Sequence, residues 1–167
     1  MKNSILSKFY EHLKYCNRRQ ILKDYYFRYK IDKSVKFGES PILYCPGIIS
    51  IGEGTHIGNY ATIMAYDSMS VTIGKNCAIS HYIAIYTMNP NPLNRDKLET
   101  GNVFIGDGVW IGHTVYINQG VSIGDGAVVG AHSVVVDDIP PYCVAVGAPA
   151  RVVRKFNVEE KYAFHAD

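Results

Sequence analysis

Several features that would assign a chain to a familiar class are missing from these 167 residues. No apolar run approaches the ~18 residues that a membrane-spanning helix needs. The first twenty residues contain no apolar core of a signal peptide, so we expect a cytoplasmic protein. No two of the four cysteines form a C-x-x-C pair, and their wide spacing favours buried reduced thiols over disulfides or structural zinc.

Charge is unevenly distributed along the chain. Residues 1–36 contain ten Lys/Arg and three Asp/Glu, a net charge of +7, whereas residues 37–167 have a net charge of −5. Hydrophobic residues make up 47% of the chain and charged residues 19%, which is typical of a folded domain. We therefore expect one globular domain with a basic appendage that has a different task.

An aliphatic residue recurs every six positions from Ile51 onward and is often followed by glycine. This period fits neither an α-helix nor the alternation of a hairpin sheet. It predicts short strands, three to a coil of 18 residues, in a solenoid whose coils stack ~4.8 Å apart. Twelve positions in register disfavour the alternative, a glycine-rich sandwich. These positions are Ile51, Ile57, Ile63, Ile73, Ile79, Ile85, Ile105, Ile111, Ile117, Ile123, Val129 and Val135.

A second inward position lies four residues after the aliphatic one and holds small or β-branched residues. Its members are Thr55, Ala61, Cys77, Val109, Val115, Val121, Ala127 and Ser133. Two interruptions, at residues 69–72 and 91–104, leave the register intact, so we expect them to be looped out of the solenoid. Loops of this kind often carry function.

The repeats, followed by VWIGHTVYINQGVSIGDGAVVGAHSVVVDDIPPYCVAVGAPARVVRKF, resemble the hexapeptide-repeat acyltransferases over about residues 51–155. The chain is most similar to sugar O-acetyltransferases of the maltose/galactoside type and to their relatives in surface-polysaccharide synthesis. The resemblance implies a left-handed parallel β-helix at residues 36–150, a homotrimer, and acetyl-CoA bound between neighbouring subunits. It further implies a sugar hydroxyl as the acceptor, with N-acetylation of an aminosugar or an antibiotic as the alternative.

One corner of the solenoid is predicted to carry the chemistry. Residues two positions after the aliphatic point outward there, and in successive coils they are Asn59, His81, His113 and Ala131. Acetyl transfer needs a base for the acceptor's proton, which suits histidine. His81 lies in an I-x-H stretch that resembles the family's signature for that base, so we predict that His81 is catalytic. We assign His113 to contact with the pantetheine arm or thioester, with catalysis by His113 as an alternative. For both histidines the remaining alternative is a surface residue at a permissive corner.

The acceptor loop departs from the family pattern. Maltose-type relatives carry a histidine in a T-x-x-H-P-like stretch, whereas the segment Tyr86–Leu93 contains none. We predict that Asn89, Asn91, Asn59 and Tyr82 bind the substrate, although Asn89 and Asn91 also suit turns beside prolines. No nucleophile motif is visible, which favours direct transfer over an acyl-enzyme.

The C-terminal box Gly147–Lys155 matches the part of the family that lies by the nucleotide end of coenzyme A. Arg151 and Arg154 suit phosphate binding, and Ala131 matches a position where the backbone meets the cofactor. The alternative is a basic cap on a short C-terminal helix within residues 151–167. Relatives often have Thr-Lys where this chain has Val136-Asp137, so one expected cation is lost. We expect the outward Trp110 to pack between subunits.

The basic segment 1–35 reads as one or two amphipathic helices within residues 4–30, with Leu22, Tyr25 and Tyr29 on one face of the second. Either it packs across the mouth of the solenoid or on a neighbouring subunit, or it anchors the protein at an anionic membrane surface. In the first of these helices, Ile5, Phe9, Leu13 and Cys16 share a face. We expect no nucleic-acid partner, because the rest of the chain is acidic and no binding motif is present.

Two other functions fit the same fold less well. A γ-carbonic-anhydrase-like zinc enzyme needs a second histidine five residues after the corner histidine, where Asn118 stands, so we expect no metal. Ice-binding solenoids repeat T-x-T on a flat face, and that array is absent. The paired histidines also argue against a non-catalytic scaffold.

Overall fold

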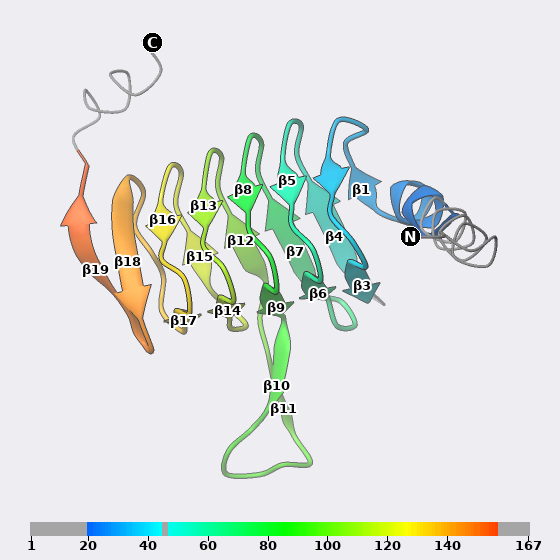
Figure 1. Ribbon diagram of the computed structural model, residues 1–167. Coiled ribbons are helices and arrows are strands. Elements are labelled where there is room, and N and C mark those ends of the chain that lie inside the picture. The colour runs from blue at the N-terminus through cyan, green and yellow to red at the C-terminus, as the bar shows by residue number, and fades with distance from the viewer. Residues whose placement is uncertain (1–19, 45–46, 157–167) are drawn as a thin grey trace, which may run out of the picture.

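The computed structural model describes residues 20–44 and 47–156, and they form a parallel β-solenoid (Figure 1). In each coil the chain contributes one strand to each of three sheets, so that every sheet gains strands in steps of one coil. The first sheet contains, in spatial order, β1 (Lys30–Ile31), β4 (Ile48–Ile51), β7 (Ser70–Ile73), β12 (Val103–Ile105) and β15 (Ser122–Ile123). The predicted solenoid of stacked coils is confirmed.

The second sheet contains the most strands, and the third sheet forms the remaining side of the prism. The second contains β2 (Lys36–Phe37), β5 (His56–Ile57), β8 (Ala78–Ile79), β13 (Trp110–Ile111), β16 (Val128–Val129), β18 (Cys143–Gly147) and β19 (Ala150–Lys155). The third contains β3 (Ile42–Tyr44), β6 (Thr62–Met64), β9 (Ala84–Tyr86), β14 (Tyr116–Ile117) and β17 (Val134–Val135).

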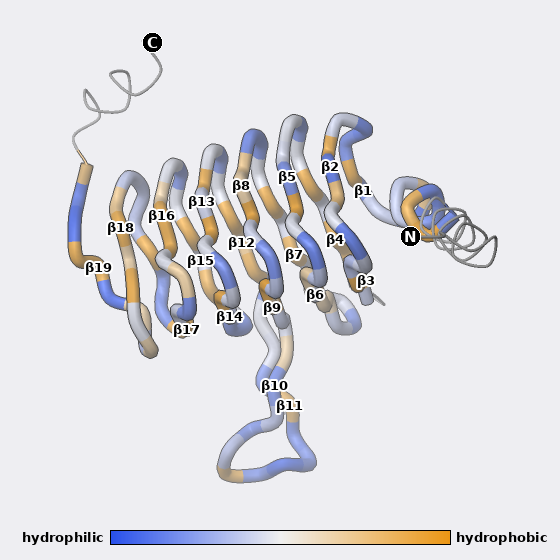
Figure 2. Tube along the Cα trace, viewed as in Figure 1, coloured by the Kyte–Doolittle hydropathy of each residue, from blue (hydrophilic) through white to orange (hydrophobic). Residues whose placement is uncertain are grey.

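The core is a set of aliphatic ladders that run along the inside of the prism. All twelve aliphatic positions predicted from the sequence are at most 2% exposed. Along the winding tube of Figure 2, orange apolar stretches recur between blue and pale ones. Truncating one of these isoleucines to alanine should cost about 2–5 kcal/mol, so the ladders hold the corners rigidly.

The solenoid begins one coil before Ile51, where the regular register starts, and one strand before the predicted boundary at residue 36. Ile31, Phe37 and Leu43 are buried, six residues apart, and belong to strands that pair with the coil of Ile51. The predicted start at residue 36 is therefore wrong. The spacing from Leu43 to Ile51 is eight instead of six, which broke the periodic count.

The longer interruption forms a hairpin that projects from the prism (Figure 1). Strands β10 (Met88–Pro90) and β11 (Leu98–Thr100) pair antiparallel, and the chain re-enters the first sheet at β12. A looped-out insertion is thus confirmed, but its predicted bounds of 91–104 are not, because the hairpin pairing begins at Met88 and Val103–Ile105 already pairs with β7. The shorter interruption was placed wrongly at residues 69–72, because Ser70–Ile73 pairs with β4 and the extra residues form the turn at 65–69.

A helix at residues 20–28 covers the first coil, as one of the two hypotheses for the basic segment proposed. Leu22, Tyr25, Tyr26 and Tyr29 pack against the core. The Tyr25 hydroxyl donates to Pro41 O at 3.1 Å, and the Tyr26 hydroxyl donates to Val35 O at 2.6 Å. Burial, with a smaller effect from Asp32, raises the pKa of Tyr26. The predicted face of Ile5, Phe9, Leu13 and Cys16 lies outside the described residues.

The other end closes with a strand. β19 returns antiparallel beside β18, so the prediction of a helix from residue 151 is wrong for residues 151–155. Beyond the prolines at 140–141, β18 still pairs parallel with β16, and β19 then ends the described solenoid as an antiparallel edge strand. Residues 157–167 lie outside the described part. Within the described residues no helix is long and apolar enough to cross a membrane.

Candidate active site

The turn between the second and third sheets, which we call the histidine corner, stacks the predicted residues in one column. Strand pairing sets Ile57 beside Ile79, Ile79 beside Ile111, and Ile111 beside Val129. Two residues beyond these partners lie, coil by coil, Asn59, His81, His113 and Ala131, and the column now begins at Glu39. The rings of His81 and His113 lie 5.7 Å apart between centroids. The predicted juxtaposition of the two histidines is confirmed.

A second column in the same corner was missed by the sequence analysis. The next residue of each coil has a positive φ, and these residues are Ser40, Tyr60, Tyr82, Thr114 and His132, with φ from 46° to 58°. Tyr60 and Tyr82 stack at 5.0 Å with an interplanar angle of 18°. Tyr82 and His132 also contact the ring of His113, at 5.4 and 6.4 Å between centroids. Counting three residues past each aliphatic would have found Tyr60 and His132.

A ladder of hydrogen bonds ties the corner side chains to the backbone of the preceding coil. Asn59 Oδ1 accepts from the Glu39 N–H at 2.8 Å. One coil further, His81 Nδ1 accepts from the Asn59 N–H, also at 2.8 Å. Because a backbone N–H can only donate, Nδ1 of His81 must carry a lone pair, and the neutral ring then holds its proton on Nε2.

His113 breaks this ladder. Within residues 20–44 and 47–156, neither of its ring nitrogens has a hydrogen-bond partner. Its side chain is exposed, and its surroundings are the rings of His81, Tyr82 and His132. An exposed imidazole with both nitrogens available can accept a proton from a bound hydroxyl.

The two asparagines predicted to bind a sugar hold the hairpin instead. Asn89 donates to Asn118 Oδ1 at 2.7 Å and to Gln119 Oε1, and it accepts from the Tyr116 hydroxyl at 3.1 Å. Asn91 donates to Glu99 and accepts from the backbone of residues 93 and 94. Their amides are thus engaged within the chain, which agrees with the alternative of turn and loop residues. Sugar binding by Asn89 and Asn91 stays a prediction.

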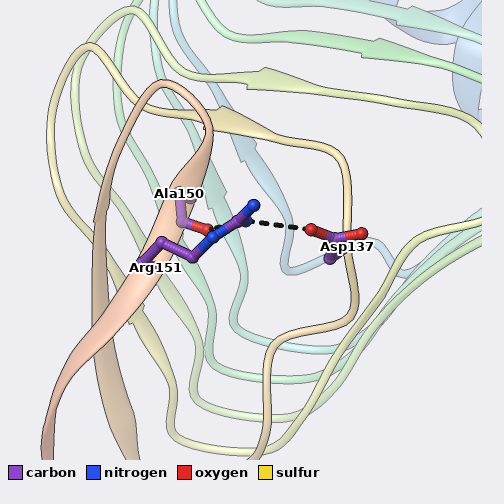
Figure 3. A network of polar contacts seen from close by, with 3 residues as sticks. All are labelled: Asp137, Ala150 and Arg151. Carbon is purple, nitrogen blue, oxygen red and sulfur yellow. Dashed lines mark hydrogen bonds and ion pairs between the residues drawn. The ribbon is translucent and has the colours of Figure 1, made fainter.

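The predicted phosphate-binding arginines lie on the exposed strand β19. Arg151 Nη1 donates to Asp137 Oδ2 at 2.9 Å and also to the carbonyl oxygen of Ala150 (Figure 3). The side chains of Arg151 and Asp137 are 62% and 65% exposed, so the pair is weak. Arg154 lies over the Phe156 ring at 5.3 Å. A strand with Arg151, Arg154 and Lys155 open to solvent fits the phosphates of a nucleotide.

Trp110 points outward from the second sheet between Ala78 and Val128, as predicted, and is 55% exposed. Among the described residues, no group of three or more His, Cys, Asp or Glu is placed to hold a metal ion. Cys77 and Cys143 are free and buried, and burial raises the pKa of each thiol.

Comparison with known proteins connects this architecture to a family. The sequence model "Bacterial transferase hexapeptide (six repeats)" matches residues 102–137, and "Hexapeptide repeat of succinyl-transferase" matches residues 48–80. Galactoside O-acetyltransferase of Escherichia coli K12 is 37% identical over 139 residues, which cover 78% of this chain and 68% of that protein. The chain belongs to the hexapeptide-repeat acetyltransferases.

Solved structures agree with this membership. A maltose O-acetyltransferase from Clostridium difficile 630 is 33% identical, with a TM-score of 0.69, and the match covers 86% of this chain and 77% of that chain. A hexapeptide-repeat acetyltransferase of Vibrio cholerae O1 biovar eltor, solved with acetyl-coenzyme A, is 31% identical with a TM-score of 0.61, covering 77% and 72%. The described fold of this acetyltransferase is therefore shared along most of its length.

Proposed function

We propose that this acetyltransferase moves the acetyl group of acetyl-CoA to a hydroxyl of a sugar by direct attack within a ternary complex. The observation that carries the proposal is the pair of exposed, adjacent histidines in the histidine corner of a chain that belongs to this family. The acetyl-CoA complex of the Vibrio cholerae relative supports the donor, and the galactoside and maltose enzymes support a sugar as the acceptor.

The chemistry needs one base and no covalent intermediate. A corner imidazole takes the proton of the acceptor hydroxyl while its oxygen bonds to the thioester carbonyl carbon. The tetrahedral intermediate then collapses, the carbon–sulfur bond breaks, and the leaving thiolate receives the proton. General-base catalysis contributes about 10²–10⁴-fold, so positioning of donor and acceptor supplies much of the remaining acceleration.

The stacked tyrosines beside the histidines offer a surface for the acceptor. Tyr60 and Tyr82 are 43% and 52% exposed, and Tyr82 contacts the ring of His113. An aromatic face with a polar hydroxyl at its edge suits the apolar C–H face and the hydroxyl rim of a sugar ring. The pair would therefore hold the sugar next to the base, while Arg151 and Arg154 bind phosphates of the donor.

The proposal is tested by following thiol release from acetyl-CoA with the full chain and a panel of free, nucleotide-linked and lipid-linked sugars. Acetyl esters on a sugar, identified by mass spectrometry and by lability to mild base, are the expected product. Base-stable amides formed only on aminosugars would instead support the N-acetyl alternative. Thiol release that no sugar or aminosugar stimulates would contradict the proposal.

We also propose a homotrimer, as the family resemblance implies. The outward Trp110, 55% exposed in a single chain, supports a wall that a neighbouring subunit covers. Sedimentation equilibrium at micromolar concentration should give three times the chain mass, and a monomer would contradict this.

We further propose a role in surface-polysaccharide synthesis at the inner face of the membrane, which the lipid-linked acceptors in the panel test. Co-sedimentation with anionic vesicles tests the membrane contact.

A further inference from the structure

The two histidines of the histidine corner are not chemically equivalent. His81 accepts a hydrogen bond through Nδ1 from the Asn59 N–H, 22 residues earlier in the chain. In that arrangement its neutral ring carries a proton on Nε2, so its remaining nitrogen donates and cannot accept the proton of a hydroxyl. To act as a base through Nδ1, His81 would have to give up the hydrogen bond that it accepts from the Asn59 N–H.

The neighbouring coil shows what this hydrogen bond is for. Asn59 makes the same contact to the Glu39 N–H with its side-chain oxygen, at the same distance of 2.8 Å. An amide has no basic nitrogen, so the contact itself requires only an acceptor atom at this corner position. His81 therefore continues a structural ladder that an asparagine begins.

His113 follows in the same column but makes no such hydrogen bond, since no described residue bonds to its ring nitrogens. It is exposed, and the groups facing it are His81 and Tyr82 from the preceding coil and His132 from the following one. None of these is a carboxylate or a lysine. The ring is held by aromatic contacts on both sides while either nitrogen can face a ligand.

Resting on the proposed acetyl transfer, we propose that His113 is the general base and that His81 is a positioning residue. His113 takes the proton of the acceptor hydroxyl as the oxygen–carbon bond forms, and gives it to the thiolate of coenzyme A when the carbon–sulfur bond breaks. His81 holds the turn of the preceding coil and sets the ring contact that orients His113. This reverses the assignment that the sequence motif suggests.

The same substitution at both positions separates the two roles. His81→Asn keeps an acceptor for the Asn59 N–H, as Asn59 itself provides for Glu39, and should lower kcat by less than about tenfold. His113→Asn should lower kcat by about 10²–10⁴-fold. His56→Asn, on the exposed face of β5, controls for the substitution itself.

Nitrogen-15 NMR of the imidazoles gives a readout that does not depend on turnover. Neutral His81 should show a protonated Nε2 and an unprotonated Nδ1. A loss of activity in His81→Asn with normal turnover in His113→Asn, or a protonated Nδ1 on His81, would overturn this assignment and leave the acetyl transfer standing. A wild-type chain that acetylates no acceptor of the panel would overturn the proposed function and the assignment with it.

Discussion

Two corners of the prism have the same backbone conformation but different side chains. In the turns from the first to the second sheet, which we call the glycine corner, the positive-φ positions are Gly54, Asn76, Gly108, Gly126 and Tyr142, with φ from 53° to 69°. In the histidine corner the equivalent positions contain no glycine or asparagine, and two of them are tyrosines. The left-handed conformation costs an ordinary residue roughly 1–2 kcal/mol. Such strain concentrates where side chains have a function.

Backbone geometry alone therefore did not select the side chains of the histidine corner. At four of its five positions the glycine corner has glycine or asparagine, which the conformation favours, with Tyr142 as the exception, and its inward Cys77 is buried. In the histidine corner, five residues other than glycine adopt the left-handed conformation, and several of them have aromatic or imidazole rings exposed to solvent. We infer that the histidine corner is the chemical face and the glycine corner a structural one.

The largest effect is expected from Gly108→Ala in the glycine corner. A Cβ there would meet no atom within 4 Å, so the change tests the positive φ of 63° without steric conflict. It should lower the free energy of unfolding by about 1–2 kcal/mol, measured by urea denaturation. The reverse change in the histidine corner, Thr114→Gly, should raise stability by up to about 1 kcal/mol. A neutral Gly108→Ala would remove the energetic basis of the comparison.

The next effect concerns the stacked tyrosines. Tyr82→Ala removes the stack with Tyr60 and the ring contact with His113, each worth about 0.5–1.5 kcal/mol. We expect KM for the sugar acceptor to rise by up to about tenfold, with a smaller change in KM for acetyl-CoA. Tyr44→Ala, an exposed tyrosine of β3, is the matched control. Equal effects of the two variants on acceptor KM would argue against an aromatic acceptor surface.

A smaller effect is expected at the third corner, where Asp137 pairs with Arg151. If Arg151 binds donor phosphates, Asp137→Asn frees its guanidinium and should lower KM for acetyl-CoA about two- to fivefold, since exposed ion pairs contribute about 0.2–1 kcal/mol. Asp96→Asn at the exposed hairpin tip serves as the control. An increase in KM would mean that the pair positions Arg151 for the phosphates and does not compete with them.

The smallest effect is a pH dependence in the glycine corner. Burial raises the pKa of the Cys77 thiol, so above the usual thiol pKa of ~8.5 the unfolded chain releases this proton before the folded one. Stability that is complete below this pH should therefore decline as the pH rises. Cys77→Val, which copies Val109 of the next coil, should make the decline above pH ~8.5 shallower. Tyr26 and Cys143, whose pKa values are also raised, contribute in the same direction. An unchanged slope would contradict the assignment to Cys77.

The core and the column of residues in the histidine corner were predictable because a six-residue period fixes both the inward and the corner positions. That count predicts that His81 and His113 lie side by side, although the hairpin insertion lengthens the spacing from Ile85 to Ile105 to twenty residues. The count failed at the first coil, where the spacing from Leu43 to Ile51 is irregular. It also gave no information on Gly147–Lys155, where an antiparallel strand replaced the expected helix.

By itself the sequence determined the solenoid, its inward ladders and the residues that share a corner, because local periodicity sets which side of each strand a residue faces. Only the tertiary structure decided what those residues do there. The donor to His81 Nδ1 lies 22 residues earlier, the partners of Asn89 lie 29 and 30 residues later, and the stack of Tyr60 on Tyr82 spans two coils. Hydrogen bonds between coils fix the tautomer of a histidine and the amide of an asparagine, and no period in one strand can specify them.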